Sequence, residues 1–161
     1  MNLRILSRRP ALVALLTVLS ASAALAQSNS VSVFGSINGH AVAVVQGVTV
    51  QAAGGGTGDA SHIGRFNYTM QATVNGPIGV GVFLLSFSNG DVIYGSFSGL
   101  GEPTITPNVF RIVETLTIKG GTGRFQGAAG SLTFDRLADV SELPNFDSHS
   151  GTVTGTMSTP K

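Results

Sequence analysis

The chain has 161 residues, which is enough for one domain with its own hydrophobic core. It contains no cysteine, and this excludes disulfide bonds, thiol catalysis and cysteine metal sites. Nine basic and eight acidic residues are spread without any basic patch or run, so nucleic acids and anionic membrane surfaces are poor candidate partners.

Residues 1–26 have the organisation of a secretory signal peptide. Three arginines precede the apolar run ALVALLTVLSASAALA, which ends at Ala26 in a small-x-small cleavage pattern. The run is shorter than the ~20 residues that a membrane-spanning helix needs. We therefore expect Sec export, cleavage after Ala26, and a secreted or periplasmic domain of residues 27–161 with no membrane segment. Cleavage would change the net charge from +1 to −2.

The rest of the sequence alternates between apolar and polar residues at the two-residue period of β-strands. The predicted strands are 31–37, 40–52, 62–74, 79–88, 91–99, 108–120, 123–137 and 150–159. Two Asn-Gly pairs, at Asn38 and at Asn89, predict two-residue hairpins. Two longer connections are expected, a glycine loop at 52–61 and a polar insertion at 138–149.

Eight strands that are mostly joined to their sequence neighbours indicate either an up-and-down barrel or a two-sheet sandwich. Closure favours the barrel, because it removes the exposed edges that a chain poor in charge could not guard. Glycines inside the strands also suit a barrel, which uses them to bend. We predict an all-β fold, a single eight-stranded antiparallel β-barrel, with a β-sandwich as the alternative.

The stretch GGTGRFQGAAG at residues 120–130 is glycine-rich, but it does not fit a phosphate-binding loop. A P-loop requires Gly-Lys-Ser/Thr, and a dinucleotide site requires a helix where SLTFDRL alternates like a strand. Strong strand patterns on both sides argue against a linker. A hairpin corner remains, with glycines supplying positive φ angles. We expect Phe125 to plug the end of the barrel and Arg124 to reach backbone carbonyls or a carboxylate.

The segment IKGGTGRFQGAAGSLTF resembles a stretch of the dirigent and allene oxide cyclase-like barrel superfamily, which has the calycin type of fold. ASHIGRF resembles a segment of small exported bacterial members, and the resemblance spans roughly Val31 to Thr159. It implies an eight-stranded antiparallel barrel, sometimes with an apolar cavity. Plant relatives cyclise an unstable epoxide or steer radical coupling without a cofactor. No catalytic motif of those enzymes can be placed on this sequence, so the resemblance implies the fold alone.

Alternation in the run FRIVETLTI places Glu114 on a face whose other residues are apolar. Those residues are Phe110, Ile112, Leu116 and Ile118. A buried carboxylate must be paired or protonated, and a raised pKa would make Glu114 an acid or base in a cavity. The alternative is a structural brace, with Arg65 or Arg124 as its partner.

A regular strand would place His62 on the inward face that carries Phe66, Tyr68 and Met70. An inward histidine beside Tyr68 could bind or protonate a ligand carbonyl. The alternative is a histidine at the strand end that hydrogen-bonds a loop. The three histidines of the chain lack a His-x-His spacing, so we expect no metal and no other cofactor.

Apolar inward faces interrupted by few polar groups are typical of ligand pockets. We therefore predict that the barrel binds a small apolar or aromatic molecule. The predicted apolar lining is Phe66, Met70, Phe110 and Leu116, with Phe83 or Leu84, and the predicted polar anchors are His62, Tyr68 and Glu114.

Two other classes of function stay open. One is a cofactor-free isomerase or cyclase, in which Glu114 or His62 moves a proton. The other is a structural protein that forms a homo-oligomer through threonine-rich outer faces. Those faces carry Thr115, Thr117, Thr152, Thr154 and Thr156.

Overall fold

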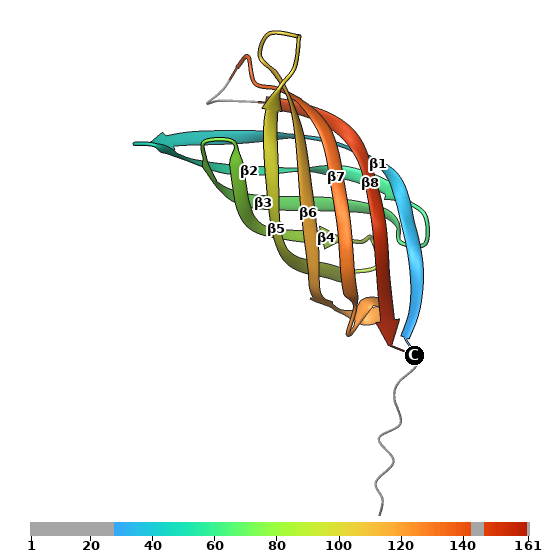
Figure 1. Cartoon of the computed structure of the whole chain (residues 1–161). Coiled ribbons are helices and arrows are strands. Elements are labelled where there is room, and N and C mark those ends of the chain that lie inside the picture. Colours follow the sequence, from blue (N-terminus) through green and yellow to red (C-terminus); the bar gives the residue numbers. More distant parts are fainter. Residues whose placement is uncertain (1–27, 143–146, 161) are drawn as a thin grey trace, which may run out of the picture.

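The structure of the protein is a computed structural model that describes residues 28–142 and 147–160. The predicted signal peptide at 1–26 lies outside these residues. Eight antiparallel strands pair in sequence order, and β1 pairs with β8 to close a single barrel (Figure 1). The predicted fold is therefore confirmed, and the sandwich alternative is not. The strands are β1 Ser28–Gln46, β2 Thr49–Ala60, β3 Gly64–Asn75, β4 Ile78–Ser86, β5 Val92–Pro103, β6 Val109–Gly121, β7 Ala129–Asp139 and β8 Asp147–Pro160.

The boundaries of the first two strands differ from those predicted. The hairpin predicted at Asn38 is wrong, because β1 continues to Gln46 and the chain turns at Gly47, whose φ is 64°. The glycine loop predicted at 52–61 is wrong, because residues 52–60 belong to β2. Gly58 of β2 stands opposite Phe66 of β3, and its missing side chain leaves room for the Phe66 ring. A Cβ atom at Gly54 or Gly56 would instead meet residues of β1. The hairpin at Asn89 is confirmed.

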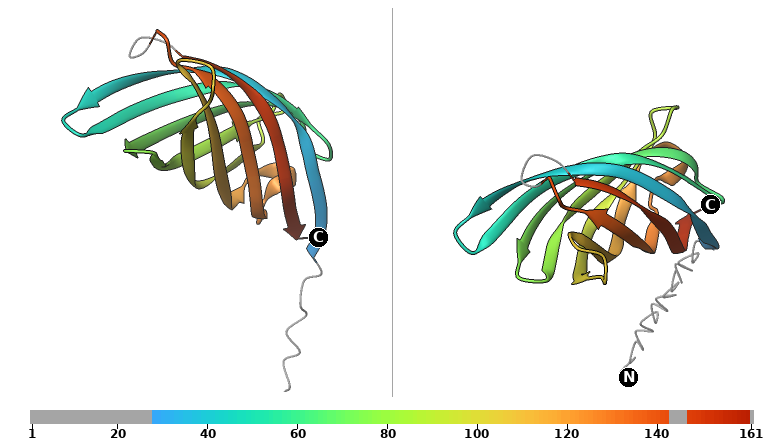
Figure 2. Two further views of the ribbon diagram at one scale, coloured as in Figure 1. Left: turned by 45° about the horizontal axis from the view of Figure 1, so that its top comes forward. Right: turned by 90° about the horizontal axis from the view of Figure 1, so that it is seen from above.

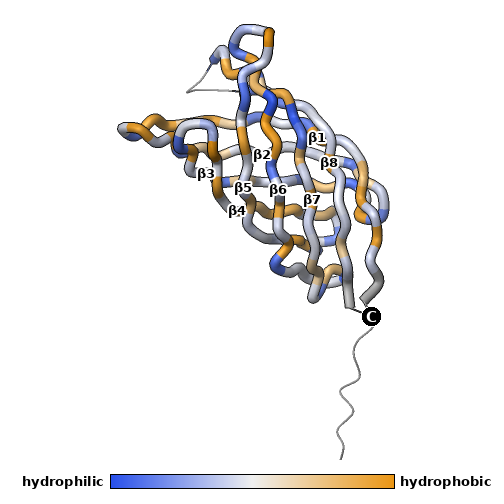
Figure 3. The backbone as a smooth tube through the Cα atoms, viewed as in Figure 1, coloured by the Kyte–Doolittle hydropathy of each residue, from blue (hydrophilic) through white to orange (hydrophobic). Residues whose placement is uncertain are grey.

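Inward and outward residues alternate along the strands, which gives the mixed hydropathy seen along the backbone (Figure 3). The inward residues fill the end of the barrel where β2 meets β3 and where β4 meets β5. An aromatic cluster forms this filled end, with Phe87 packed between Phe66 and Phe125 at centroid distances of 6.2 Å and 4.6 Å. The threonines expected on the outer faces of β6 and β8 are exposed.

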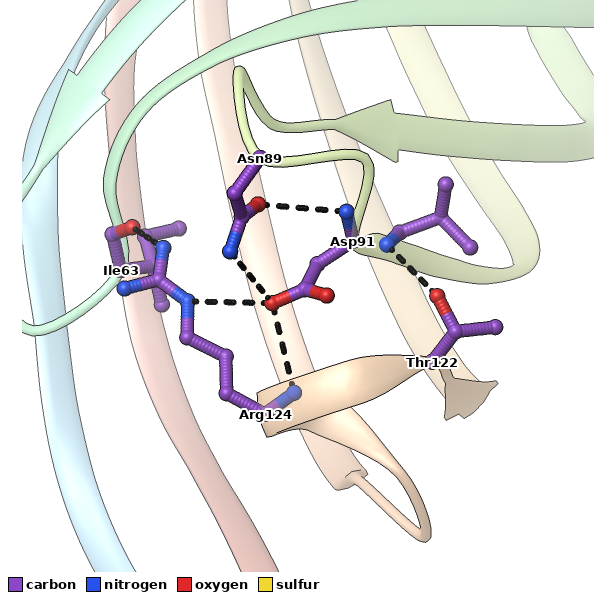
Figure 4. A network of polar contacts seen from close by, with 6 residues as sticks. Ile63, Asn89, Asp91, Thr122 and Arg124 are labelled. Carbon is purple, nitrogen blue, oxygen red and sulfur yellow. Dashed lines mark hydrogen bonds and ion pairs between the residues drawn. The ribbon is translucent and has the colours of Figure 1, made fainter.

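The predicted corner after β6 closes this filled end. A single turn of 3-10 helix, η1 (Gly123–Phe125), carries Phe125 into the core, where it is 3% exposed. Arg124 donates a hydrogen bond to the carbonyl oxygen of Ile63 at 2.7 Å, and its Nε lies 3.7 Å from the Asp91 carboxylate (Figure 4). Both roles predicted from the sequence are confirmed. The return strand starts later than predicted, at Ala129.

Arg124 links three loops that connect successive strands. Its guanidinium lies over the rings of Phe87 and Phe125, at 5.1 Å and 4.5 Å from their centroids. Asp91 also accepts hydrogen bonds from the Asn89 side chain and from the Arg124 backbone N–H. The β2–β3, β4–β5 and β6–β7 connections are thereby held at one end of the barrel. The β1–β2 turn lies at the opposite end (Figure 2).

Truncation of the plug tests whether the filled end stabilises the barrel. Phe125→Ala should lower the free energy of unfolding by about 3–5 kcal/mol, because it leaves a cavity in a packed aromatic cluster. Leu137→Ala on the outer face of β7 removes a half-exposed side chain and should change stability by less than about 1 kcal/mol. Urea unfolding of both variants measures the difference, and equal losses would contradict the assigned role of Phe125.

Candidate functional site

The end of the barrel opposite η1 contains a cavity of about 470 Å³. Its walls are apolar, and they are formed largely by small inward residues of β1 to β5, because alanine and glycine leave space that larger side chains would fill. The wall residues include Ala41, Ala43, Val50, Ala52, Ala72, Val74, Gly79, Phe97, Gly101, Phe110 and Ile112. Glu114, Arg136 and Asp147 are the charged residues that line it. The molecule therefore combines one filled end with one hollow end.

A buried ion pair lies at the floor of this cavity. Arg136 of β7 donates hydrogen bonds from Nε and Nη2 to the two carboxylate oxygens of Glu114 of β6, each at 3.0 Å. The side chains are 12% and 7% exposed. Burial opposes the charge on Arg136, but the hydrogen bonds and the charge of Glu114 outweigh it and raise the pKa of the guanidinium. The guanidinium is therefore charged.

Gly99 of β5 makes the burial of this pair sterically feasible. It is the register partner of Glu114, and a Cβ atom at Gly99 would lie 2.6 Å from Cγ of Glu114. The prediction that Glu114 faces inward is confirmed. Its partner is Arg136 rather than Arg65 or Arg124, which lie at the other end of the barrel.

A chain of three hydrogen-bonded polar side chains crosses the interior from β3 to β8. The Tyr68 hydroxyl lies 2.6 Å from Nε2 of His149, and Nδ1 of His149 lies 3.1 Å from Oδ1 of Asp147. All three residues are buried. Burial is the main cause that raises the pKa of Tyr68 to about 12, with Glu114 and Asp147 adding to the shift and Arg136 opposing it. The phenol therefore stays protonated at neutral pH.

The ion pair and the Tyr68–His149–Asp147 chain form one site. A smaller void of about 40 Å³ is lined by Tyr68, Glu114, Arg136 and His149, and Arg136 and Glu114 also line the large cavity. We call these four residues and Asp147 the floor cluster. The cluster offers a bidentate ion pair, a protonated phenol and an Asp–His pair, which is a set of groups able to orient a ligand and to move a proton.

Six of the residues proposed from the sequence are buried or half-buried, at different depths of the barrel. Tyr68 and Glu114 belong to the floor cluster, Met70 lines the smaller void and Phe110 lines the large cavity. Phe66 and Leu116 are buried in the core and line neither of the two cavities. The inward placement predicted for His62 is wrong, because β2 ends at Ala60 and His62 lies exposed in the turn with a φ of 65°.

Sequence reasoning missed three members of the floor cluster. Arg136 shares its alternating face with Leu132, Phe134 and Ala138, and that pattern could have identified it as inward. His149 likewise has the parity of buried residues in β8. Asp147 falls in the polar insertion predicted at 138–149, but it is buried, because β8 already starts at this residue.

Two further findings concern the described residues only. Residues 28–142 and 147–160 hold no group of three or more His, Asp or Glu side chains arranged to bind a metal ion. Within the same ranges, no helix has the length and hydropathy needed to cross a membrane.

Comparison with known proteins gives one structural match. No protein-family model matches the chain, and no curated protein is similar to it in sequence. The chain is structurally similar to a pterocarpan synthase dirigent protein of known structure, with 12% identity and a TM-score of 0.34 over 82% of this chain and 87% of that one. At these values the similarity says nothing about activity.

Unpairing the buried charges tests their coupling. Arg136→Met should lower the free energy of unfolding by about 3–5 kcal/mol, because it leaves the Glu114 carboxylate buried without a partner. The double variant Glu114→Met/Arg136→Met removes both charges and should recover most of that loss. Urea unfolding measures both values, and a double variant as unstable as the single one would contradict the coupling.

The chain offers a matched control on the outer face of the same two strands. Arg111 of β6 and Asp135 of β7 form an exposed bidentate pair, with distances of 2.9 Å and 2.6 Å. Arg111→Met should destabilise the protein far less than Arg136→Met does, because water replaces the lost partner of Asp135.

Proposed function

We propose that the protein is exported and binds a small apolar or aromatic molecule in the open end of the barrel. The observation that carries this proposal is the cavity of about 470 Å³, with apolar walls and a polar floor. Its volume falls within the ~300–1,000 Å³ range of ligand pockets, and its make-up is typical of them. The filled end gives the barrel its stability, which leaves the other end available for a ligand.

Native mass spectrometry of protein from the exported fraction tests both parts of the proposal. The polypeptide should start at Gln27, and the native sample should carry an extra mass that is lost on denaturation. A chain that retains residues 1–26 would contradict export. A bare mass, together with no uptake of an apolar dye such as Nile red, would contradict binding.

Filling the cavity locates the site within the molecule. Gly79 and Gly101 line the cavity, and a Cβ atom at either would meet its nearest neighbours at ordinary contact distances of 3.6 Å and 3.8 Å. Gly79→Leu and Gly101→Leu should therefore fold and lose the bound molecule. Val80→Leu, which enlarges an outward residue of the same strand, is the matched control and should retain it. Retention of the molecule by all three variants would place it elsewhere.

The buried Tyr68–His149–Asp147 chain favours a second candidate function, a cofactor-free isomerase. In this function Tyr68 donates its phenolic proton to one position of the bound molecule, and the resulting phenolate takes up the proton that leaves another position of the same molecule. His149, whose ring Asp147 orients, holds the Tyr68 oxygen in place for both transfers. Atoms are conserved, because a proton leaves one position of the molecule and another is added elsewhere.

Ligand extraction distinguishes the isomerase from a simple carrier. Wild type and Tyr68→Phe should carry compounds of equal mass that differ in chromatographic retention, since the variant keeps the unconverted isomer. Identical compounds in the two proteins would contradict catalysis and would leave the binding function as it stands.

A further inference from the structure

One hydrogen-bond donor of the floor cluster has no acceptor. Glu114 engages Nε and Nη2 of Arg136, whereas Nη1 is buried and has no hydrogen-bond partner among residues 28–142 and 147–160. A guanidinium carries two N–H groups on Nη1, and a buried donor without an acceptor is rare and costly. The position next to this nitrogen is therefore suited to an acceptor atom from a bound molecule.

The place of Arg136 makes it accessible to a ligand of the barrel. Its side chain lines the large cavity and also the smaller void below, which it shares with Tyr68, Glu114 and His149. An acceptor that reaches Nη1 must therefore enter the floor of the cavity rather than bind at its rim. The apolar part of the same molecule then lies against the alanine and valine walls.

The charges of the floor cluster restrict that acceptor to a neutral group. The charge of Arg136 is already balanced by Glu114, and Asp147 adds a second carboxylate to the cavity lining. The cluster sums to −1 with neutral His149 and to zero with charged His149, so it has no surplus positive charge in either state. A carboxylate would be repelled by two buried carboxylates, and an ammonium has no lone pair with which to accept a hydrogen bond from Nη1.

We infer that the molecule held in the cavity is neutral and presents a carbonyl-type oxygen to Nη1 of Arg136, as a ketone, ester or amide does. This inference rests on the proposed binding function and specifies the chemical class of the ligand. Arg136 is then a positioning residue. Glu114 holds Nε and Nη2 of its guanidinium in place, and Nη1 is available to the ligand.

A series of probes with one hydrocarbon chain and different head groups tests the inference. Displacement of Nile red from the full-length mature protein is measured with 2-decanone, decanoate, decylamine and decane. The ketone should bind at least about tenfold more tightly than decanoate, decylamine or decane, the factor expected for one additional hydrogen bond to a charged donor. Decanoate or decylamine binding as tightly as the ketone would overturn the inference.

Variants assign the preference to Arg136. Glu114→Met/Arg136→Met makes the floor apolar without leaving an unpaired charge, and it should lose the preference for the ketone while it still binds decane. The matched control is Arg111→Met/Asp135→Met, which removes the outer pair of the same strands and should keep the order of affinities seen in the wild type. A ketone preference that persists in the inner double variant would also overturn the inference.

The outcomes separate this inference from the function on which it rests. If decane and the ketone bind equally well, the cavity binds apolar molecules but Arg136 selects nothing, and only the inference fails. If neither Nile red nor any of the probes binds the folded wild-type protein, the proposed binding function fails as well.

Discussion

Closure between the first and last strands is the constraint on which the rest of the structure depends. β1 and β8 pair continuously from Ser28 with Pro160 to Ala41 with Asp147, so each of the eight described strands has two neighbours and the sheet has no edge strand. A chain without cysteine has no covalent means of holding such a sheet together. Closure also fixes the register, and a slip by one residue would turn every inward side chain, Glu114 included, to the outside.

The sizes of the inward side chains divide the closed interior into two ends. Around η1 the inward positions carry phenylalanine and leucine, and Arg124 holds three connections against them. Towards the other end the inward positions of β1, β2 and β3 carry alanine, and a cavity results. The floor cluster lies where the two ends meet. Its polar groups are therefore fixed by the packed core on one side and face the cavity on the other. Such an arrangement preorganises a site.

The sequence predicted those features that depend on local patterns. Alternation gave the strand number and the inward face of Glu114, and the glycine-rich corner gave the roles of Arg124 and Phe125. The sequence-based predictions failed where the structure depends on contacts between residues far apart in the chain. The glycines of β2 read as a break in a strand until their neighbours on β1 and β3 are known, and the turn that carries His62 shifts the parity on which its placement was based. Arg136, Asp147 and His149 become a site only once β3, β6, β7 and β8 are brought together in the barrel.

The floor cluster is hard to explain by folding stability alone. Replacing a buried ion pair with apolar side chains of similar size is often neutral or stabilising, and the η1 end of the same barrel shows that this sequence can fill its interior with aromatic residues. The chain instead buries two carboxylates, a guanidinium, an imidazole and a phenol beneath an unfilled apolar space. Such groups are tolerated because each is matched, Arg136 by Glu114 and His149 by Asp147 and Tyr68. That internal matching leaves no surplus positive charge for an anionic ligand to neutralise, so the cluster selects a ligand through the direction of its remaining hydrogen-bond donor, Nη1 of Arg136.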